Sequence, residues 1–315
     1  MTTVCVAFRE LIANILIIMV NIMCLPIMIW NCFMSFFHVC TVKKPIVPRV
    51  VAITGANAGI GEGIAHAYAR DKASLVLIAR NKERLEKVAE ACKELGSPDV
   101  KIVQMDVSDT KAVADFFDEK TVEYGIELFI ANAGVSTIPK TPLLDQMEKM
   151  FQINLLGALA GVNSVFKAMK KRGRGGQIAV VSSVFGFQVP PTLLNYGASK
   201  AALMSYCRDL RALGKDEGIK VNTIAPGYIA TEMTAALPRR NKFFYLTPEK
   251  FGEQIKKGLE DDVAFISLPL HQYFLFSVSA ALPISVRQWI AIAFHKTLDS
   301  IIKMNANTKE EKKII

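Results

Sequence analysis

The amino-acid sequence predicts an α/β fold, a doubly wound parallel sheet with helices on both faces. Short β-branched apolar runs alternate with charged, helix-periodic segments through the middle of the chain. A glycine-rich turn follows the first of these runs. The length of 315 residues suits one large domain of this class with appendages at its ends. Such alternation implies parallel strands joined by crossover helices, and ligands then bind beyond the carboxyl ends of the strands.

The first appendage is an apolar segment, residues 11–42, which follows a tail, residues 1–10. The segment contains no Asp, Glu, Lys or Arg, and a helix needs about 20 apolar residues to span a bilayer. We therefore expect one uncleaved transmembrane anchor. A cleaved signal peptide is the alternative, but its apolar region would be shorter, at roughly 7–15 residues. Lys43, Lys44 and Arg49 follow the segment, so the positive-inside rule places the main domain in the cytosol.

Residues 48–267 are expected to form the main domain. Six apolar runs within it have the length and β-branched content of strands buried on both faces. A seventh run, residues 263–267, has the composition of a last strand. The segments between the runs, such as 81–95, are charged and helix-periodic. The six runs are residues 49–54, 74–79, 100–107, 126–133, 177–183 and 220–226.

A second apolar segment, residues 268–296, follows the last predicted strand. Pro269 and Pro283 interrupt it, so we do not expect it to cross a bilayer. We expect an interfacial or re-entrant segment that also forms a wall of the substrate site. A buried pair of core helices is the alternative.

The basic tail, residues 297–315, ends in the sequence KEEKKII. Lys312 and Lys313 resemble the dilysine signal of endoplasmic-reticulum membrane proteins, which is read from the cytosol; a solvated tail is the alternative. The two ends together predict a protein of the endoplasmic reticulum membrane whose catalytic domain faces the cytosol.

Composition and charge agree with a membrane partner. The chain is 51% hydrophobic, with a mean hydropathy of +0.28 and a net charge of +9. A basic surface beside apolar segments suits an anionic membrane face. The sequence has no long basic run with interleaved aromatic residues, so no nucleic-acid partner is expected. The six cysteines form no CxxC pair, which argues against a zinc site and a disulfide framework and indicates a reducing compartment.

The glycine-rich turn, TGANAGIG, runs from Thr54 to Gly61. Gly55, Gly59 and Gly61 allow a tight turn and the close approach of a pyrophosphate, and the following helix offers its N-terminal amides. No Lys-Ser or Lys-Thr pair follows, so the turn is not a mononucleotide P-loop. The pattern predicts a dinucleotide-binding turn.

The second predicted strand ends at Ala79 and is followed by Arg80, with Lys82 nearby. An acidic residue there would bind the adenosine ribose of NAD(H), whereas a guanidinium suits the 2′-phosphate of NADP(H). We therefore expect NADPH/NADP⁺ as the cofactor and NADH to a lesser degree. A solvated arginine at a helix start is the alternative.

Tyr196 and Lys200 stand one helical turn apart in the stretch NYGASK. On a helix they share a face, and the positive charge favours the phenolate and lowers the pKa of the tyrosine. Such a tyrosine can exchange protons near neutral pH. Taken alone, these six residues favour an ordinary surface pair on a helix, so the rest of the chain must decide.

Together these motifs, spread over residues 48–262, resemble the short-chain dehydrogenase/reductase family. TGANAGIG is similar to its TGxxxGxG cofactor turn, ANAG (131–134) to its NNAG strand end, and PGYIAT (226–231) to its PGxxxT cofactor clamp. INLLG, SSVFG and YGASK are similar to the segments that carry its catalytic residues. Ala131 stands where the family has Asn, a change that affects sheet packing more than chemistry. The resemblance implies a Rossmann-type fold and a homodimer as a candidate assembly.

The resemblance also implies a catalytic set of four residues. Tyr196 is then the general acid–base on the substrate oxygen, and Ser183 donates a hydrogen bond to the same oxygen. Lys200 lowers the pKa of Tyr196 and holds the nicotinamide ribose, and Asn154 holds a water that links Lys200 to solvent. The implied cofactor-binding residues are Gly55, Asn57, Gly59, Ile60, Gly61, Arg80, Asp106, Val107, Asn132, Ala133, Gly134, Tyr196, Lys200, Pro226, Gly227, Ile229 and Thr231.

The sequence thus predicts an NADP(H)-dependent oxidoreductase that reduces a ketone of a lipophilic small molecule, such as a long-chain ketone, a sterol, a retinoid or a 3-ketosphinganine. We expect a substrate lid over residues 232–262, whose basic and aromatic first half could lie on anionic lipid or be an ordinary mobile lid. Two alternatives stay open: a catalytically idle scaffold, and a membrane-shaping or lipid-droplet protein whose apolar ends are its main function. Turnover of NADPH with a lipid ketone separates the enzyme from both.

Overall fold

The computed structural model describes residues 45–235 and 245–297, together with Ile15, Met19 and Pro26 as single positions. The chain divides into a unit over residues 1–45 and a unit over residues 46–315, and everything below concerns the second. The expected anchor and the dilysine signal lie outside the described residues. Among the helices of the described part, none is both long and apolar enough to cross a bilayer.

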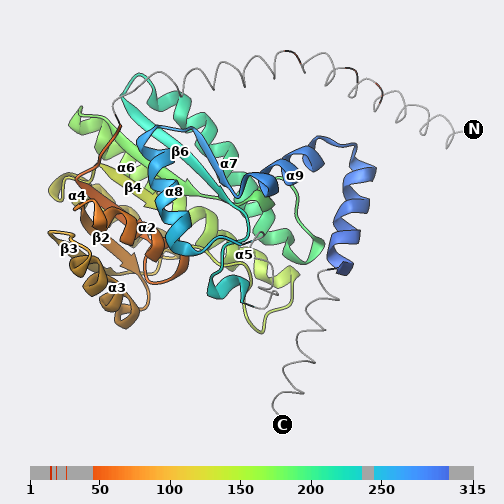
Figure 1. The fold of residues 1–315 in the computed structure, drawn as a ribbon, viewed down its shortest axis with the longest axis horizontal. Coiled ribbons are helices and arrows are strands. Elements are labelled where there is room, and N and C mark those ends of the chain that lie inside the picture. Colours follow the sequence, from red (N-terminus) through yellow and green to blue (C-terminus); the bar gives the residue numbers. More distant parts are fainter. Residues whose placement is uncertain (1–14, 16–18, 20–25, 27–44, 236–244, 298–315) are drawn as a thin grey trace, which may run out of the picture. The chain divides into compact units, whose positions relative to one another are not determined.

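The core of the described unit is a sheet of seven parallel strands in the order β3-β2-β1-β4-β5-β6-β7 (Figure 1). All seven predicted strands are confirmed, and so is the parallel, doubly wound arrangement. The order reverses between β1 and β4, so a crevice for ligands is expected at the carboxyl ends of these two strands. The bounds are β1 Val50–Thr54, β2 Ser74–Ala79, β3 Val100–Gln104, β4 Leu128–Ala131, β5 Gly176–Val181, β6 Ile219–Pro226 and β7 Phe265–Leu268.

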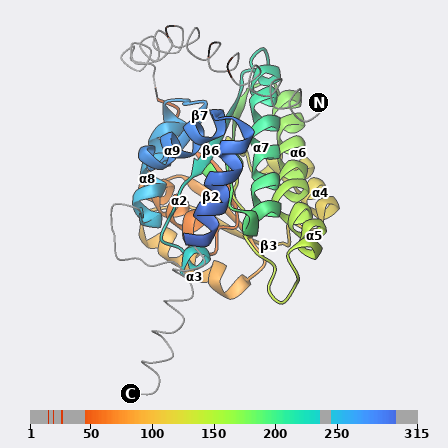
Figure 2. The same ribbon diagram turned by 90° about the vertical axis from the view of Figure 1, so that its right-hand side faces the viewer.

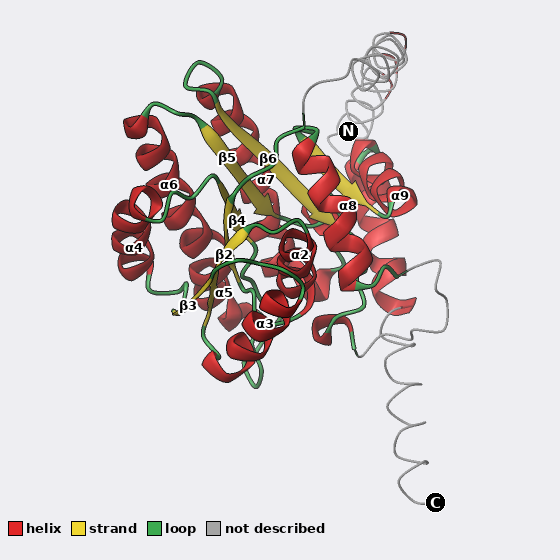
Figure 3. Cartoon of the chain, turned by 60° about the vertical axis from the view of Figure 1, so that its left-hand side comes forward, coloured by secondary structure: helices red, strands yellow, loops and turns green. Residues whose placement is uncertain are grey.

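Helices cover both faces of the sheet (Figure 3). The buried side chains of α2, α3 and α8 pack on one face, and those of α4, α6 and α7 pack on the other. The α-helices are α2 Gly59–Arg70, α3 Lys82–Glu94, α4 Thr110–Glu123, α5 Met147–Phe151, α6 Ala158–Arg172, α7 Leu194–Gly214, α8 Pro248–Glu260 and α9 Leu270–Ala281. Residues 284–297 form one more helix. The shorter elements are the 3₁₀ turns η1 Leu144–Gln146, η3 Val184–Gly186, η4 Pro191–Leu193 and η5 Glu232–Thr234, and the π-helix η2 Gln152–Gly157.

The strands are apolar along their whole length because the sheet is buried on both sides. Along β1, Val51 and Ile53 belong to one hydrophobic cluster, whereas Ala52 between them belongs to the cluster on the other face. Successive side chains of a strand point to opposite faces, so a strand covered on both sides needs an apolar residue at every position. This is the pattern that predicted the fold.

The helices α2 and α8 cross with their backbones in direct contact. A Cβ atom added to Gly63 would collide with the carbonyl group of Pro248, and one added to Gly252 would collide with the carbonyl group of Gly63. Glycine at both positions is what permits this approach. The outer face of α8 is polar, but Phe251 and Ile255 on its inner face are fully buried.

The substrate lid was expected over residues 232–262, but most of the described part of this segment is a helix of the core. Residues 236–244 lie outside the described residues, and Pro248–Glu260 form α8, a helix that covers the sheet. The apolar spacing of Phe251, Ile255 and Leu259 explains the difference, because it creates one continuous buried stripe.

The C-terminal apolar segment begins directly after β7. The helix α9 contacts β7 and η3, and the helix over residues 284–297 follows it on the outside of the unit (Figure 2). Gln272, Phe276 and Ser279 are buried on the inner face of α9, whereas Phe274 and Leu275 on its outer face are 69% and 64% exposed. The helix α9 thus exposes large apolar side chains on its outer face, whereas its inner face is partly polar.

Candidate active site

A glycine turn joins β1 to α2 at the point where the strand order reverses. Gly55 and Gly59 have φ values of +66° and +60°, which disfavour any side chain. A Cβ atom on Gly61 would collide with the carbonyl group of Gly55 and lie 2.7 Å from Asn132 Nδ2. The N-cap residue of α2 is Ala58, whose side chain makes no cap hydrogen bond to the first amides of the helix. The turn thus fits a dinucleotide pyrophosphate by its shape and by the N–H groups at the start of α2.

The end of β4 braces this turn. Asn132 Nδ2 donates hydrogen bonds to the carbonyl oxygens of Thr54 (3.0 Å) and Gly55 (3.1 Å). The backbone amides of Asn132 and Ala133 donate to Thr54 Oγ1, at 3.0 and 3.2 Å. Asn132 and Ala133 therefore shape the cofactor turn through Thr54, a role that the sequence did not indicate.

Arg80 and Asp106 meet beyond the ends of β2 and β3. The distance from Arg80 Nη1 to Asp106 Oδ2 is 3.6 Å, and the Arg80 side chain is 61% exposed. Burial acts to raise the pKa of Asp106, but hydrogen bonds from the amide and hydroxyl of Ser108, together with the Arg80 charge, outweigh it and lower that pKa. The Arg80 guanidinium is thus held at this edge, with donors still open to solvent.

The segment after β6 returns to the cofactor turn. A Cβ atom on Gly59 would lie 3.0 Å from Thr231 Cγ2, so the two segments are in contact. One residue further on, Glu232 forms an ion pair of 2.9 Å with Arg84 at the start of α3. The sequence pattern gave no sign of this link between the cofactor clamp and the α3 region.

The first turns of α7 bring together Tyr196, Lys200 and Ser183. Lys200 Nζ donates to the carbonyl oxygen of Val181 at 2.8 Å and lies 5.8 Å from the centre of the Tyr196 ring. Ser183 Oγ accepts from the amide of Phe185 at 3.2 Å, and its hydroxyl also hydrogen-bonds the Tyr196 side chain. The structure therefore places these three predicted residues together at the carboxyl end of β5.

The electrostatics of this group differ from the simple expectation. Burial raises the pKa of Tyr196 above its usual value, and the hydrogen bond with Ser183 only partly opposes this. Burial lowers the pKa of Lys200 to about 8. Removal from water disfavours the charged form of each group, and the Lys200 ammonium is directed at a carbonyl oxygen. The predicted lowering of the Tyr196 pKa by Lys200 is therefore wrong for the protein alone.

Asn154 lies in the π-helix and is fully buried. Its Oδ1 accepts from the amide of Val135 at 2.8 Å, and its Nδ2 donates to the carbonyl oxygen of Val135 at 2.8 Å and to Ser199 Oγ at 3.3 Å. A Cβ atom on Gly134 would lie 3.2 Å from Asn154 Oδ1 and 3.4 Å from Lys200 Nζ. Asn154 is thus near Lys200, as expected, but its amide braces the loop after β4.

Aromatic rings form a wall beside Tyr196. The Phe185 ring lies edge-on to Tyr196, Tyr228 and Phe276, with centroid distances of 6.4, 5.8 and 5.2 Å. Phe276 in turn lies 6.3 Å from Phe294 in the helix over residues 284–297. The row of rings therefore runs from the phenol of Tyr196 to the C-terminal helices. Sequence reasoning missed Phe185 and Phe276, although it expected this segment to form a wall of the site.

Polar contacts fix the C-terminal helices to the loops of the site. Gln272 Oε1 accepts from the amide of Tyr228 at 2.8 Å, which ties α9 to the segment after β6. Arg287 Nε donates to Gln188 Oε1 at 3.1 Å, and Gln188 Nε2 donates to the carbonyl oxygen of Arg287 at 3.2 Å. The loop that follows Ser183 is therefore held by the helix over residues 284–297.

Comparison with known proteins agrees with this geometry. The family model for short chain dehydrogenase matches residues 49–242. The chain belongs to the short-chain dehydrogenase family. This is a family of oxidoreductases that act on alcohol and ketone groups with NAD(H) or NADP(H), and the glycine turn described above fits such a cofactor.

Curated relatives of this short-chain dehydrogenase include steroid enzymes of plants. The chain is 34% identical over 217 residues to "11-beta-hydroxysteroid dehydrogenase A" of Sesamum indicum, a match that covers 66% of this chain and 60% of that protein. It is 30% identical over 269 residues to "11-beta-hydroxysteroid dehydrogenase-like 4A" of Arabidopsis thaliana, covering 82% of this chain and 89% of that protein. The chain thus spans about three fifths of the sesame relative.

Solved structures of short-chain dehydrogenases share the fold. An alcohol dehydrogenase from Thermococcus sibiricus complexed with 5-hydroxy-NADP is 29% identical, with a TM-score of 0.60, and the match covers 70% of this chain and 94% of that one. A short-chain type dehydrogenase/reductase from Mycobacterium marinum is 25% identical, with a TM-score of 0.61 and coverage of 70% and 93%.

Proposed function

We propose that this short-chain dehydrogenase is an NADP(H)-dependent enzyme that reduces a ketone of a lipophilic substrate. The observation that carries the proposal is the meeting of Tyr196, Ser183 and Lys200 beside the glycine turn, with an aromatic wall on their open side. These three side chains supply a proton donor, an oxygen-binding group and a buried amine at one strand end.

The chemistry follows from the protonation of these groups. A raised pKa keeps the Tyr196 phenol protonated near neutral pH, which is the form that a ketone reduction requires. Tyr196 donates this proton to the carbonyl oxygen, and the Ser183 hydroxyl stabilises the charge that develops on that oxygen. Lys200, whose pKa is about 8, can return a proton toward the phenol. When bound, the nicotinamide cofactor supplies the hydride.

The cofactor preference rests on Arg80. Its guanidinium is half exposed and stands where an NAD enzyme carries a carboxylate that binds the ribose. A guanidinium can bind a phosphate dianion through two parallel hydrogen bonds. We therefore assign NADP(H) to this chain in preference to NAD(H).

The lipophilic substrate rests on the aromatic wall and on the relatives. Phe185, Tyr228 and Phe276 offer ring faces and edges beside Tyr196, a surface suited to a bulky apolar molecule. The plant relatives are named as hydroxysteroid dehydrogenases, and a steroid is a bulky apolar molecule of this kind. Sterols, retinoids, long-chain ketones and 3-ketosphinganine remain the candidate substrates.

A membrane partner completes the proposal. The outer faces of α9 and of the helix over residues 284–297 carry exposed apolar side chains, among them Phe274, Leu275 and Trp289. Such a surface suits the interface of a bilayer. With the apolar segment 11–42, it supports a protein held at the endoplasmic reticulum membrane with its catalytic domain in the cytosol. A homodimer is the proposed assembly.

The decisive experiment is Tyr196→Phe, assayed by NADPH consumption on a panel of lipid ketones in detergent. We expect turnover to fall by roughly 10²–10⁴-fold, the usual contribution of a general acid, with NADPH binding retained. Tyr206→Phe is the matched control, because Tyr206 lies on the same helix and only hydrogen-bonds Asn163 Oδ1 at 2.6 Å. Activity of Tyr196→Phe within a few-fold of the parent would remove Tyr196 from its role. NADPH binding without turnover of any ketone would favour the scaffold alternative.

Protease protection in sealed microsomes tests the topology. We expect a tag after Ile315 to be digested and a tag before Met1 to be protected, since the main domain is proposed to face outward. Protection of the C-terminal tag would mean a second crossing or an inverted protein. Digestion of both tags would mean that the segment 11–42 does not cross.

A further inference from the structure

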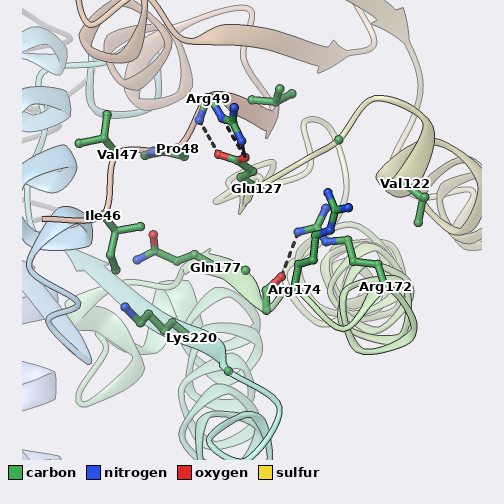
Figure 4. Close-up of a pocket in the computed structure, with 15 residues that line it drawn as sticks. Ile46, Val47, Pro48, Arg49, Val122, Glu127, Arg172, Arg174, Gln177 and Lys220 are labelled. Carbon is green, nitrogen blue, oxygen red and sulfur yellow. Dashed lines mark hydrogen bonds and ion pairs between the residues drawn. The ribbon is translucent and has the colours of Figure 1, made fainter. Parts of the chain in front are cut away.

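A hollow opens at the amino ends of the strands (Figure 4). Tyr196 and Lys200 lie at the other end of the sheet, beside the carboxyl end of β5. Its walls come from the segments that lead into β1, β4, β5 and β6. Four basic side chains and one carboxylate line it: Arg49, Arg172, Arg174, Lys220 and Glu127. The proposed reductase chemistry uses none of these residues.

The single carboxylate of the hollow is already engaged. Glu127 accepts hydrogen bonds from the amide and from the Nε of Arg49, at 2.7 and 3.3 Å. Arg49 therefore brings no excess charge, and Glu127 has little capacity left to neutralise another cation. The remaining three basic side chains face the hollow without a carboxylate of their own among the described residues.

Arg172 forms a fixed, positively charged wall. Its Nη1 donates to the carbonyl oxygen of Ile126 at 2.7 Å and its Nη2 to that of Gly175 at 3.0 Å, so the guanidinium binds neutral acceptors only. Its Nε is buried without a hydrogen-bond partner among the described residues. Burial lowers the pKa of Arg172, and repulsion from the nearby Arg174 lowers it further although Glu127 opposes this. Glu127, which is paired with Arg49, therefore offsets only part of the positive charge of Arg172 and Arg174.

Two glycine turns make the floor of the hollow. Gly175 and Gly218 have φ values of +65° and +64°, and a Cβ atom on Gly175 would collide with the carbonyl group of Gly218. The turns therefore pack backbone against backbone. Figure 4 shows Arg49 and Glu127 on one side of this space, Arg172 and Arg174 on a second and Lys220 on a third. The basic groups thus stand on three sides of an open hollow of about 890 Å³, which is large enough to admit a phosphate group together with the molecule that carries it.

The hollow is also adjacent in the chain to the apolar segment 11–42. Its wall begins at Ile46, four residues after Val42, and a chain of that length reaches at most about 14 Å. Lys43 and Lys44 lie in this short connection and add two positive charges. The described wall of the hollow thus begins only a few residues after the proposed anchor.

We propose that this hollow binds a phosphate group, and that the phosphate is the headgroup of an acidic lipid at the membrane surface. Arg174 and Lys220 are the side chains free to contact it, because Arg172 and Arg49 are held by other partners. Occupation of the hollow compensates the charge at this end of the sheet and orients the domain on the bilayer. The phosphate site rests on the described residues alone, whereas the lipid source rests on the proposed anchor.

Phosphate binding to the full chain in nanodiscs tests the proposal. Inorganic phosphate is titrated by calorimetry into protein in phosphatidylcholine discs, with saturating NADP⁺ present so that the cofactor site does not respond. We expect binding to the parent protein and a loss of roughly tenfold or more in Arg174→Gln and in Lys220→Gln, the value of one charge-assisted contact. Lys149→Gln, an exposed lysine on α5, is the control and leaves phosphate binding unchanged.

The same titration in discs that contain phosphatidic acid identifies the source. If the lipid headgroup fills the hollow, the parent protein in these discs no longer gives a binding signal with inorganic phosphate. Arg174→Gln and Lys220→Gln give no such signal in these discs either. An equal phosphate affinity in both kinds of disc overturns the lipid source, and absence of phosphate binding, or an equal loss in Lys149→Gln, overturns the site itself. NADP⁺ affinity, measured in the same samples, reports separately on the proposed reductase and is expected to be the same in all variants.

Discussion

Asn154→Ala tests whether the buried amide of the π-helix is a brace of the fold. The side chain makes two hydrogen bonds of 2.8 Å to the backbone of Val135 and one of 3.3 Å to Ser199 Oγ. Alanine removes all three and leaves the amide and carbonyl groups of Val135 without their partner. Each of the two short bonds contributes about 1 kcal/mol and the longer bond to Ser199 less, so we expect a loss of roughly 2–3 kcal/mol of unfolding free energy.

Urea unfolding followed by circular dichroism measures this loss. With an m-value of about 3 kcal/mol/M, the midpoint falls by roughly 0.7–1 M. Asn163→Ala is the control, because Asn163 lies on the neighbouring helix α6 and receives one hydrogen bond, from the Tyr206 hydroxyl at the surface. If Asn154→Ala unfolds at the same midpoint as the control but loses ketone turnover, then Asn154 does not stabilise the fold. Only its predicted role in proton supply would then remain.

Arg80→Asp is expected to weaken NADPH binding by roughly tenfold or more in calorimetric titration, since a charge-assisted contact of about 1.5–3 kcal/mol becomes a repulsion; equal affinity of the unmodified protein for NADH and NADPH would contradict this. Gly61→Ala should weaken both cofactors alike in the same titration, because the new methyl group collides with a carbonyl group of the turn. Burial lowers the pKa of Lys200 from 10.5 to about 8, so the unfolded chain binds more protons than the folded chain between these values. The melting temperature should therefore rise with pH across this window, and Lys200→Met should lack that rise relative to the parent. Arg287→Ala removes the guanidinium contact with Gln188 Oε1 and keeps the backbone acceptor of Gln188 Nε2. It should raise the KM for a bulky ketone in steady-state kinetics and leave NADPH affinity unchanged; an unchanged KM would mean that the guanidinium contact does not position the loop.

The strands were predictable because burial on both faces leaves a direct trace in the sequence. A run such as Leu75–Ile78 is buried throughout and needs an apolar residue at every position, and its short length and β-branched content distinguish it from a buried helix. The glycines of the cofactor turn were predictable for a similar reason. Gly55 and Gly59 have backbone conformations that other residues avoid, so the required residue type is nearly unique.

The contacts between distant segments were not predictable. Asn132 was expected to contact the cofactor. The hydrogen bonds that its side-chain amide donates to the turn after β1 depend on the register of two strands that are far apart in the chain. The same holds for Gln188 and Arg287, whose pairing depends on how the C-terminal helix returns to the site. The direction of the Tyr196 pKa was mistaken because spacing on a helix reports neighbours and not loss of water.

The glycine crossing of α2 and α8 has a consequence for how the chain reaches its native state during synthesis. The helix α2 begins the domain, but Gly252 on its partner lies almost at the end of it, with most of the sheet encoded in between. At a translation rate of about 5–20 residues per second, the apolar side of α2 waits roughly ten seconds or more for its cover. The nascent domain therefore exposes part of its core until α8 leaves the ribosome. During this interval chaperones or a nearby membrane surface can bind the exposed side of α2 and so affect the yield of folded protein.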